Sequence, residues 1–259
     1  MTILEKIIAR KKPLLAQQKK AVSIDRLKQS SYFNRPAISL KKALSQPGSS
    51  GVIAEFKRRS PSKPAINLTA DLISVTAGYQ KAGAAALSIL TDTHFFGGRN
   101  TDILQVRKNI KIPILRKDFI FDPYQIYEAK SIGADAILLI AEILSATQIA
   151  DFAALAKDLN LEVLMETHDE DNLEKITKYV DIIGVNNRNL DTFEVSLENS
   201  IRISEAIPDN KLKISESGIR SPQDINKLRA YGYQGFLIGE MFMKTSQPEL
   251  TCQQFIQNI

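Results

Sequence analysis

The apolar residues of the chain gather in short runs that recur at regular intervals. Each run is rich in branched aliphatic side chains and is bounded by polar or turn-forming residues, which is typical of buried β-strands. The runs are Val52–Lys57, Ala86–Leu90, Ile112–Lys117, Ala136–Ile140, Val163–Glu166, Ile182–Asn186, Leu212–Glu216 and Gly235–Gly239.

Segments with helical periodicity separate these runs. Ser145 and Ser221 stand where a helix N-cap is expected, and Gly83, Gly133 and Gly232 stand where helices end. Strands that alternate with helices predict parallel pairing through right-handed crossovers. The clearest helical segments are Asp71–Lys81, Tyr124–Ile132, Ser145–Leu159 and Ser221–Tyr231.

Eight strand–helix units predict an α/β fold, a closed (β/α)8 TIM barrel. The alternative is an open doubly wound sheet, which would carry a glycine-rich phosphate loop after its first strand. Here KRRSPSKP follows the first strand, so the barrel is favoured. We expect residues 1–259 to form one barrel domain. Residues 1–50, with a helical pattern over Ile3–Lys20, are expected to be an N-terminal helical extension packed on it.

The first run carries a carboxylate and an ammonium two positions apart. Because side chains alternate along a strand, Glu55 and Lys57 share a face with Ile53. A strand buried in a parallel sheet normally reads as a nearly continuous apolar run. This charged pair is therefore a departure that a functional site would explain.

Other runs also end in polar side chains: Lys117, Glu166, Asn186 and Glu216 close the third, fifth, sixth and seventh, and Arg188 follows the sixth. In a barrel these ends meet on the C-terminal face, where active sites lie. A single charged residue there can simply mark where the chain meets water, but several together indicate a site. The lysines could bind anions, act as general acids or form Schiff bases, and spacing leaves these roles open.

The loops after the seventh and eighth strands, SESGIRSPQD and LIGEMF, fit phosphate binding. Ser217, Gly218, Gly239 and Glu240 can offer backbone N–H groups there, and the glycines allow close approach. The alternative is that each glycine only makes a turn.

The charge is uneven along the chain. Residues 1–63 hold 15 Lys/Arg and 3 Asp/Glu, a net of +12, whereas the whole chain has +5. A basic leader can bind nucleic acid, a membrane surface or an anionic substrate. With few aromatic residues and no nucleic-acid-binding signature, we expect no nucleic acid or membrane partner. The longest apolar run, AILLIA, is too short to span a bilayer, so we predict a soluble, cytoplasmic protein.

Metal and thiol chemistry are not indicated. The two histidines, His94 and His168, are far apart in sequence, and the single cysteine, Cys252, stands in the C-terminal tail without a nearby histidine. We therefore predict no metal site, no disulfide and no catalytic thiol.

The chain resembles the indole-3-glycerol phosphate synthase family over nearly its whole length. The motifs that carry the resemblance are IAEFKRRSPSKP, TDTHFFGGRNTDI, PILRKDFIFDPYQIYEAKSIGADAILLI, IGVNNRNLDTFEV, ISESGIRSPQDI and GFLIGEMFMK. The resemblance implies a lyase of tryptophan biosynthesis that needs no metal or organic cofactor. Its phosphorylated small-molecule substrate is 1-(2-carboxyphenylamino)-1-deoxyribulose 5-phosphate, and indole-3-glycerol phosphate, CO2 and water are released.

By this resemblance, Lys117 is the general acid, Glu166 the general acid/base for loss of water, and Lys57 the group that holds the substrate carboxylate. The other matching residues orient these groups or bind the substrate. As orienting residues the resemblance implies Glu55, Asn186, Glu216 and Ser217. Near the phosphate it implies Ser60, Ser217, Gly218, Gly239 and Glu240. Around the ring it implies Phe96, Phe119, Leu139 and Leu190, and it adds Leu237 as a further substrate-binding residue and Arg188 as a residue near the site.

Three other functions are alternatives to a synthase of this family. Phosphoribosylanthranilate isomerase, another phosphate-binding barrel, would need a Cys/Asp pair, and Cys252 is badly placed for it. A Schiff-base aldolase would be trapped on a lysine by borohydride. A basic RNA- or surface-binding protein would use residues 1–63. The chain is expected to act as a monomer or weak oligomer.

Overall fold

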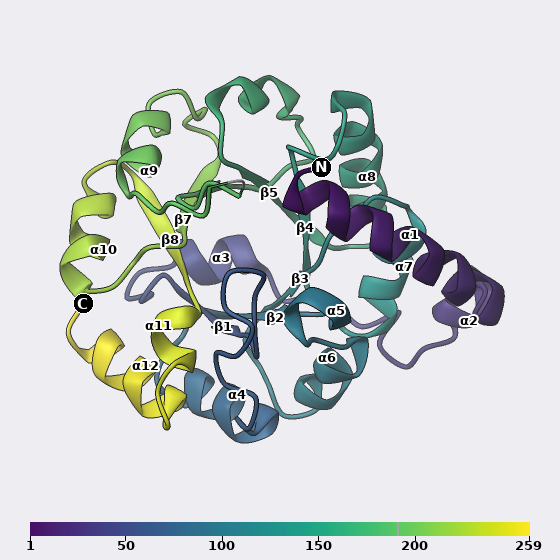
Figure 1. Ribbon diagram of the computed structural model, residues 1–259, viewed down its shortest axis with the longest axis horizontal. Helices are drawn as coiled ribbons and strands as arrows, with labels where there is room; N and C mark the ends of the chain where they lie inside the picture. Colours follow the sequence, from purple (N-terminus) through teal and green to yellow (C-terminus); the bar gives the residue numbers. More distant parts are fainter. Residues whose placement is uncertain (191) are drawn as a thin grey trace.

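The computed structural model describes residues 1–190 and 192–259. Within them, eight parallel strands pair in chain order, and the first also pairs with the last, so the sheet closes into a barrel. This confirms the predicted (β/α)8 barrel (Figure 1). The strands are β1 (Val52–Phe56), β2 (Ala86–Leu90), β3 (Ile114–Lys117), β4 (Ala136–Ile140), β5 (Glu162–Thr167), β6 (Ile182–Asn186), β7 (Leu212–Glu216) and β8 (Tyr233–Ile238).

Helices surround the barrel and also precede it. Ser145 and Ser221 cap their helices as predicted, each accepting a backbone N–H of the first turn. No helix among the described residues combines the length and the apolar character needed to cross a membrane. The helices are α1 (Ile3–Ala21), α2 (Ile24–Lys28), α3 (Leu40–Ser45), α4 (Leu72–Lys81), α5 (Thr93–Phe96), α6 (Asn100–Arg107), α7 (Tyr124–Ser131), α8 (Ala146–Asp158), the 3-10 helix η1 (Glu170–Lys175), α9 (Glu198–Ile203), α10 (Pro222–Arg229), α11 (Glu240–Met243) and α12 (Pro248–Gln257).

Alternation along the strands divides the core into two layers. On β1, Val52, Ala54 and Phe56 pack in the layer between sheet and helices, whereas Ile53 lies in the layer that fills the barrel. Glu55 is buried on the same inward face as Ile53, as the sequence predicts.

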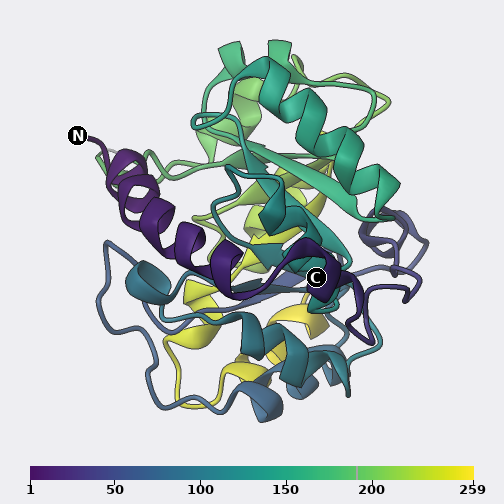
Figure 2. The same ribbon diagram turned by 90° about the vertical axis from the view of Figure 1, so that its right-hand side faces the viewer.

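The N-terminal helices close both ends of the barrel interior. From α3, Leu40 and Leu44 join the inner core near the start of β8. From α1, Ile7 joins the same core at the opposite end. Figure 1 shows α1 crossing the barrel on the side of β3 and β4, and Figure 2 shows it lying along one flank of the molecule.

Asp135, just before β4, ties this N-terminal segment to the barrel. One carboxylate oxygen accepts the Arg35 guanidinium and the Ile38 N–H, and the other accepts Arg107 and the Ile114 N–H at 2.7 and 2.8 Å. The side chain is fully buried, and all four donors pair with it directly. Breaking such a pair leaves a buried charge without its partner.

We therefore predict that Asp135→Asn lowers the free energy of unfolding by about 3–5 kcal/mol, measured by urea denaturation. As a control, Glu170→Gln removes the exposed Glu170–Arg202 ion pair and changes the free energy by less than about 1 kcal/mol. Equal effects of the two substitutions would contradict the importance of Asp135.

Candidate active site

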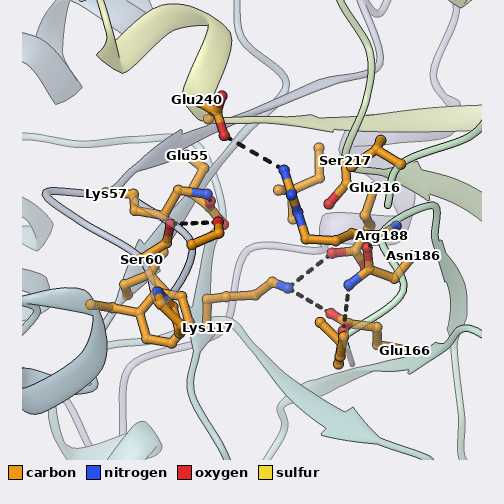
Figure 3. Close-up of a pocket in the computed structure, with 18 of the residues that line it drawn as sticks. Glu55, Lys57, Ser60, Lys117, Glu166, Asn186, Arg188, Glu216, Ser217 and Glu240 are labelled. Atoms are coloured by element: carbon orange, nitrogen blue, oxygen red, sulfur yellow. Dashed lines mark hydrogen bonds and ion pairs between the residues drawn. The ribbon is translucent and has the colours of Figure 1, made fainter. Parts of the chain in front are cut away.

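A cavity of about 300 Å³ opens at the C-terminal ends of the strands. Polar side chains at the ends of β1, β3, β5, β6, β7 and β8 converge on it, as the barrel geometry predicts (Figure 3). The site residues expected from the sequence that line it are Glu55, Lys57, Ser60, Phe96, Lys117, Phe119, Glu166, Asn186, Arg188, Leu190, Glu216, Ser217, Gly218, Leu237, Gly239 and Glu240.

Lys117 ends β3, and its ammonium lies between two buried carboxyl groups. Nζ is 2.6 Å from Glu166 Oε2 and 2.9 Å from Glu216 Oε2. Asn186 donates its amide N–H to the other oxygen of Glu166 at 3.0 Å. Figure 3 shows the lysine reaching across the cavity toward this group. The three strands β3, β5 and β7 thus place one cation against two acids.

Burial and mutual contact set the charges of this cluster. Burial opposes the charge on Lys117, but the neighbouring Glu166 and Glu216 raise its pKa above the ordinary value. Burial raises the pKa of Glu216 to about 8, against the pull of Lys117. Burial acts to raise the pKa of Glu166 as well, but Lys117 and Asn186 bring it below its usual value. At neutral pH the cluster therefore holds an ammonium, one carboxylate and one protonated carboxyl group.

A second cation–carboxylate pair lies across the cavity on β1. The Lys57 ammonium is 2.8 Å from Glu55 Oε1, and Ser88 of β2 donates its hydroxyl to Glu55 Oε2 at 3.0 Å. The strand register makes this contact, because Glu55 pairs with Ser88. The pair that departs from the apolar pattern of the first strand thus faces the cavity.

The rim of the cavity carries further charges and a tight turn. Glu240 pairs with Lys63 of the loop after β1 and lies 3.6 Å from Arg188. After β7, Ser217 and Gly218 both have positive φ, at 68° and 80°. A Cβ at Gly218 would come within 2.6 Å of Val195, so this turn requires glycine.

One predicted wall residue is wrong. Leu139 does not line the cavity, because it packs in the layer between β4 and the helices. Its neighbours Leu138 and Ile140 point inward and line the cavity instead. Since β4 is apolar on both faces, its sequence offers no alternation by which the inward residues could be chosen.

The sequence pattern also did not predict that α1 lines the cavity. Ile3, Leu4 and Ile7 line the cavity from this helix and extend its apolar side. Their helical spacing was visible, but nothing in it says which part of the barrel they cover.

Lys11 holds α1 in place. Its ammonium is 2.7 Å from Asp118 and 3.3 Å from Asp92, at the ends of β3 and β2. Burial acts to raise the pKa of Asp118, but Lys11 and Arg116 hold it at about 2. The helix that covers the cavity is therefore anchored to the residue next to Lys117.

Residues suited to a metal ion do not gather in the described part of the chain, where no three His, Cys, Asp or Glu side chains form such a group. His94 and His168 are not brought together as ligands. The Cys252 thiol is buried, and burial raises its pKa to about 12.

Comparisons with known proteins point to one family. The family model "Indole-3-glycerol phosphate synthase" matches residues 4–255. The indole-3-glycerol phosphate synthase of Bacteroides thetaiotaomicron is 48% identical over 257 residues, covering 99% of this chain and 98% of that protein. The enzyme of the same name from Lachnoclostridium phytofermentans is 39% identical over 262 residues, covering 96% of each.

Solved structures with similar folds are far more distant in sequence. The 3-hexulose-6-phosphate synthase of Salmonella typhimurium has a TM-score of 0.63 at 12% identity, covering 80% of this chain and 97% of that one. Thiamine phosphate pyrophosphorylase from Pyrococcus furiosus has a TM-score of 0.60 at 14% identity, covering 85% and 97%. At such identities the likeness shows the barrel fold alone.

The raised pKa of Glu216 predicts a pH-dependent loss of stability. The folded chain holds this proton up to about pH 8, whereas the unfolded chain releases it near 4.5. The contribution of Glu216 to stability is therefore complete below pH 4.5 and is lost as the pH rises through 8. Glu216→Gln keeps a neutral group at every pH.

We expect the free energy of unfolding of the wild type to fall relative to that of Glu216→Gln between about pH 5 and about pH 9. Urea denaturation of both proteins across this range measures the difference. Parallel curves would contradict the assigned protonation of Glu216.

Proposed function

The chain belongs to the indole-3-glycerol phosphate synthase family, and we propose that the two cation–carboxylate pairs at the barrel mouth carry out its reaction. The reaction closes the indole ring of a phosphorylated substrate and releases CO2 and water, in tryptophan biosynthesis. The observation that carries the proposal is the Lys117 ammonium, held between Glu166 and Glu216 in the cavity.

The two anionic ends of the substrate fix its orientation. Lys57 binds the carboxylate, since its ammonium lies in the cavity beside Glu55. The turn at Ser217 and Gly218, with the backbone at Gly239 and Glu240 and the Ser60 hydroxyl, binds the phosphate. The aromatic ring of the substrate lies against the apolar side, formed by Phe96, Phe119, Leu190 and Leu237 together with Leu138 and α1.

Ring closure requires an acid at the substrate ketone. As the aromatic carbon that bears the carboxylate attacks the ketone carbon, negative charge develops on the ketone oxygen. Lys117 stabilises this charge and delivers its proton there. Its raised pKa keeps it protonated until negative charge develops on the ketone oxygen, which then accepts the proton.

Loss of CO2 and of water completes the indole. The electron pair of the breaking carbon–carbon bond returns to the ring, whose iminium form accepts it without a metal ion. The new hydroxyl then leaves as water with one proton from an acid, and a base removes the neighbouring carbon-bound proton. Glu166, beside Lys117 and oriented by Asn186, serves as the acid/base of this step: it supplies the proton that leaves with the hydroxyl, and its carboxylate accepts the carbon-bound proton.

The proposal also covers the oligomeric state, the domain organisation, the compartment and the cofactors. We also propose a monomer or weak oligomer that forms one domain from residues 1–259, works in the cytoplasm, and uses no metal, organic cofactor, nucleic acid or membrane. Arg188, beside Glu240, supports the rim of the site.

We predict that Lys117→Ala and Glu166→Gln each lower kcat by about 10²–10⁴-fold, because each removes a proton-transfer group. Indole fluorescence measures turnover of 1-(2-carboxyphenylamino)-1-deoxyribulose 5-phosphate, and the wild type should be equally active in EDTA. Lys213→Ala is the matched control, since Lys213 bonds the Ser204 carbonyl away from the cavity. An inactive wild type, or full activity of Lys117→Ala, would overturn the proposal.

For Lys57→Met we predict a rise in KM of at least about 10-fold with a smaller loss of kcat, because the lost charge holds the substrate carboxylate. An analogue without the carboxyl group should bind the wild type and this variant equally well. A loss confined to kcat would show instead that Lys57 transfers a proton.

A further inference from the structure

Gly184, in the middle of β6, lies beside the carboxyl group of Glu216. A Cβ placed on Gly184 would come within 2.3 Å of Glu216 Oε1 and 3.0 Å of Leu164 Cδ1. Real atoms do not approach so closely, so any side chain here would displace the carboxyl group. Gly184 has no positive φ, so its backbone does not itself require glycine.

The strand register explains why Glu216 occupies this space. Gly184 pairs with Glu166 on one side and with Ile214 on the other, two residues before Glu216. Gly184 therefore sits on the inward face, between the two strands whose carboxyl groups meet Lys117. The Glu216 side chain is 1% exposed, and its carboxyl group pairs with Lys117 and lies beside the carboxyl group of Glu166.

We propose that Gly184 is a positioning residue for the reaction, because its missing side chain leaves the space in which Glu216 meets Lys117. This inference rests on the proposed function. Apart from Lys117, no group in the described residues donates a hydrogen bond to the Glu216 carboxyl oxygens. The residue that limits where Glu216 can lie therefore also controls the environment of the general acid.

Gly235 on β8 offers a contrasting case. A Cβ there would come within 2.3 Å of Ile214 Cγ2 and 3.2 Å of Leu44 Cδ1, in the apolar layer near α3. The steric conflict is as severe as at Gly184, but no charged group takes part. Gly235→Ala is therefore the matched control for crowding the barrel interior.

The experiment is a double-mutant cycle between Gly184→Ala and Glu216→Asp, with kcat, KM and the pH dependence of kcat as readouts. In the otherwise wild-type chain, G184A should lower kcat at least 10-fold, leave KM within about 3-fold and shift the pH profile. E216D shortens the side chain by one methylene and relieves the conflict. Adding G184A to E216D should therefore change kcat by less than about 3-fold.

Each outcome shows whether Gly184 positions Glu216 or whether a side chain there only disturbs the packing of the barrel interior. A loss from G184A that is equally large in the E216D chain would overturn the proposal, as would a G235A variant with the same kcat loss and pH shift as G184A. Should G184A alone fail to fold, the comparison of E216D with the double variant still decides: equal activity supports the proposal and an unfolded double variant contradicts it.

Failure of the proposed function would be visible separately, because the wild type would then not turn over the substrate. The same four proteins can then be compared by the pH dependence of their free energy of unfolding. G184A should alter the pH-dependent loss of stability in the otherwise wild-type chain but not in the E216D chain. An identical change in the E216D chain would overturn the proposal on this readout.

Discussion

One ammonium between two buried carboxyl groups organises the mouth of this barrel. Lys117, Glu166 and Glu216 come from three different strands, and each would be costly to bury alone. Together they neutralise one another, provided that one carboxyl group keeps its proton, as the pKa of Glu216 at about 8 allows. The proposed chemistry and the pH dependence follow from this arrangement, and the missing side chain of Gly184 leaves room for it.

The remaining parts of the site add further charged groups around the cavity. The pair of Lys57 and Glu55 lies across the cavity from Lys117, and the rim holds Lys63, Arg188 and Glu240. Between them lies an apolar side that α1 helps to form. Because Lys11 binds Asp118, next to Lys117, the N-terminal helix α1 and the end of β3 share one network of charges. A closed apolar space strengthens every electrostatic interaction within it.

The sequence predicts those parts of this structure that show a regular hydrophobic period or a residue typical of a helix or strand end. The barrel followed from eight alternating units, and the shared face of Glu55 and Lys57 followed from their spacing. Leu139 was misassigned because β4 is apolar on both faces, so no polar residue marks its orientation. The contacts of Lys11 with Asp92 and Asp118, and of Gly184 with Glu216, join segments far apart in the chain and depend on three-dimensional packing.

In this arrangement Glu216 shares the Lys117 ammonium with Glu166 while it keeps its own proton. A carbon-13 NMR titration of glutamate carboxyl groups tests this directly, with the Glu216 signal assigned by its absence in Glu216→Gln. We expect a Glu216 carboxyl signal that titrates with a midpoint near pH 8. A Glu216 midpoint near the ordinary value of 4.5 would contradict it.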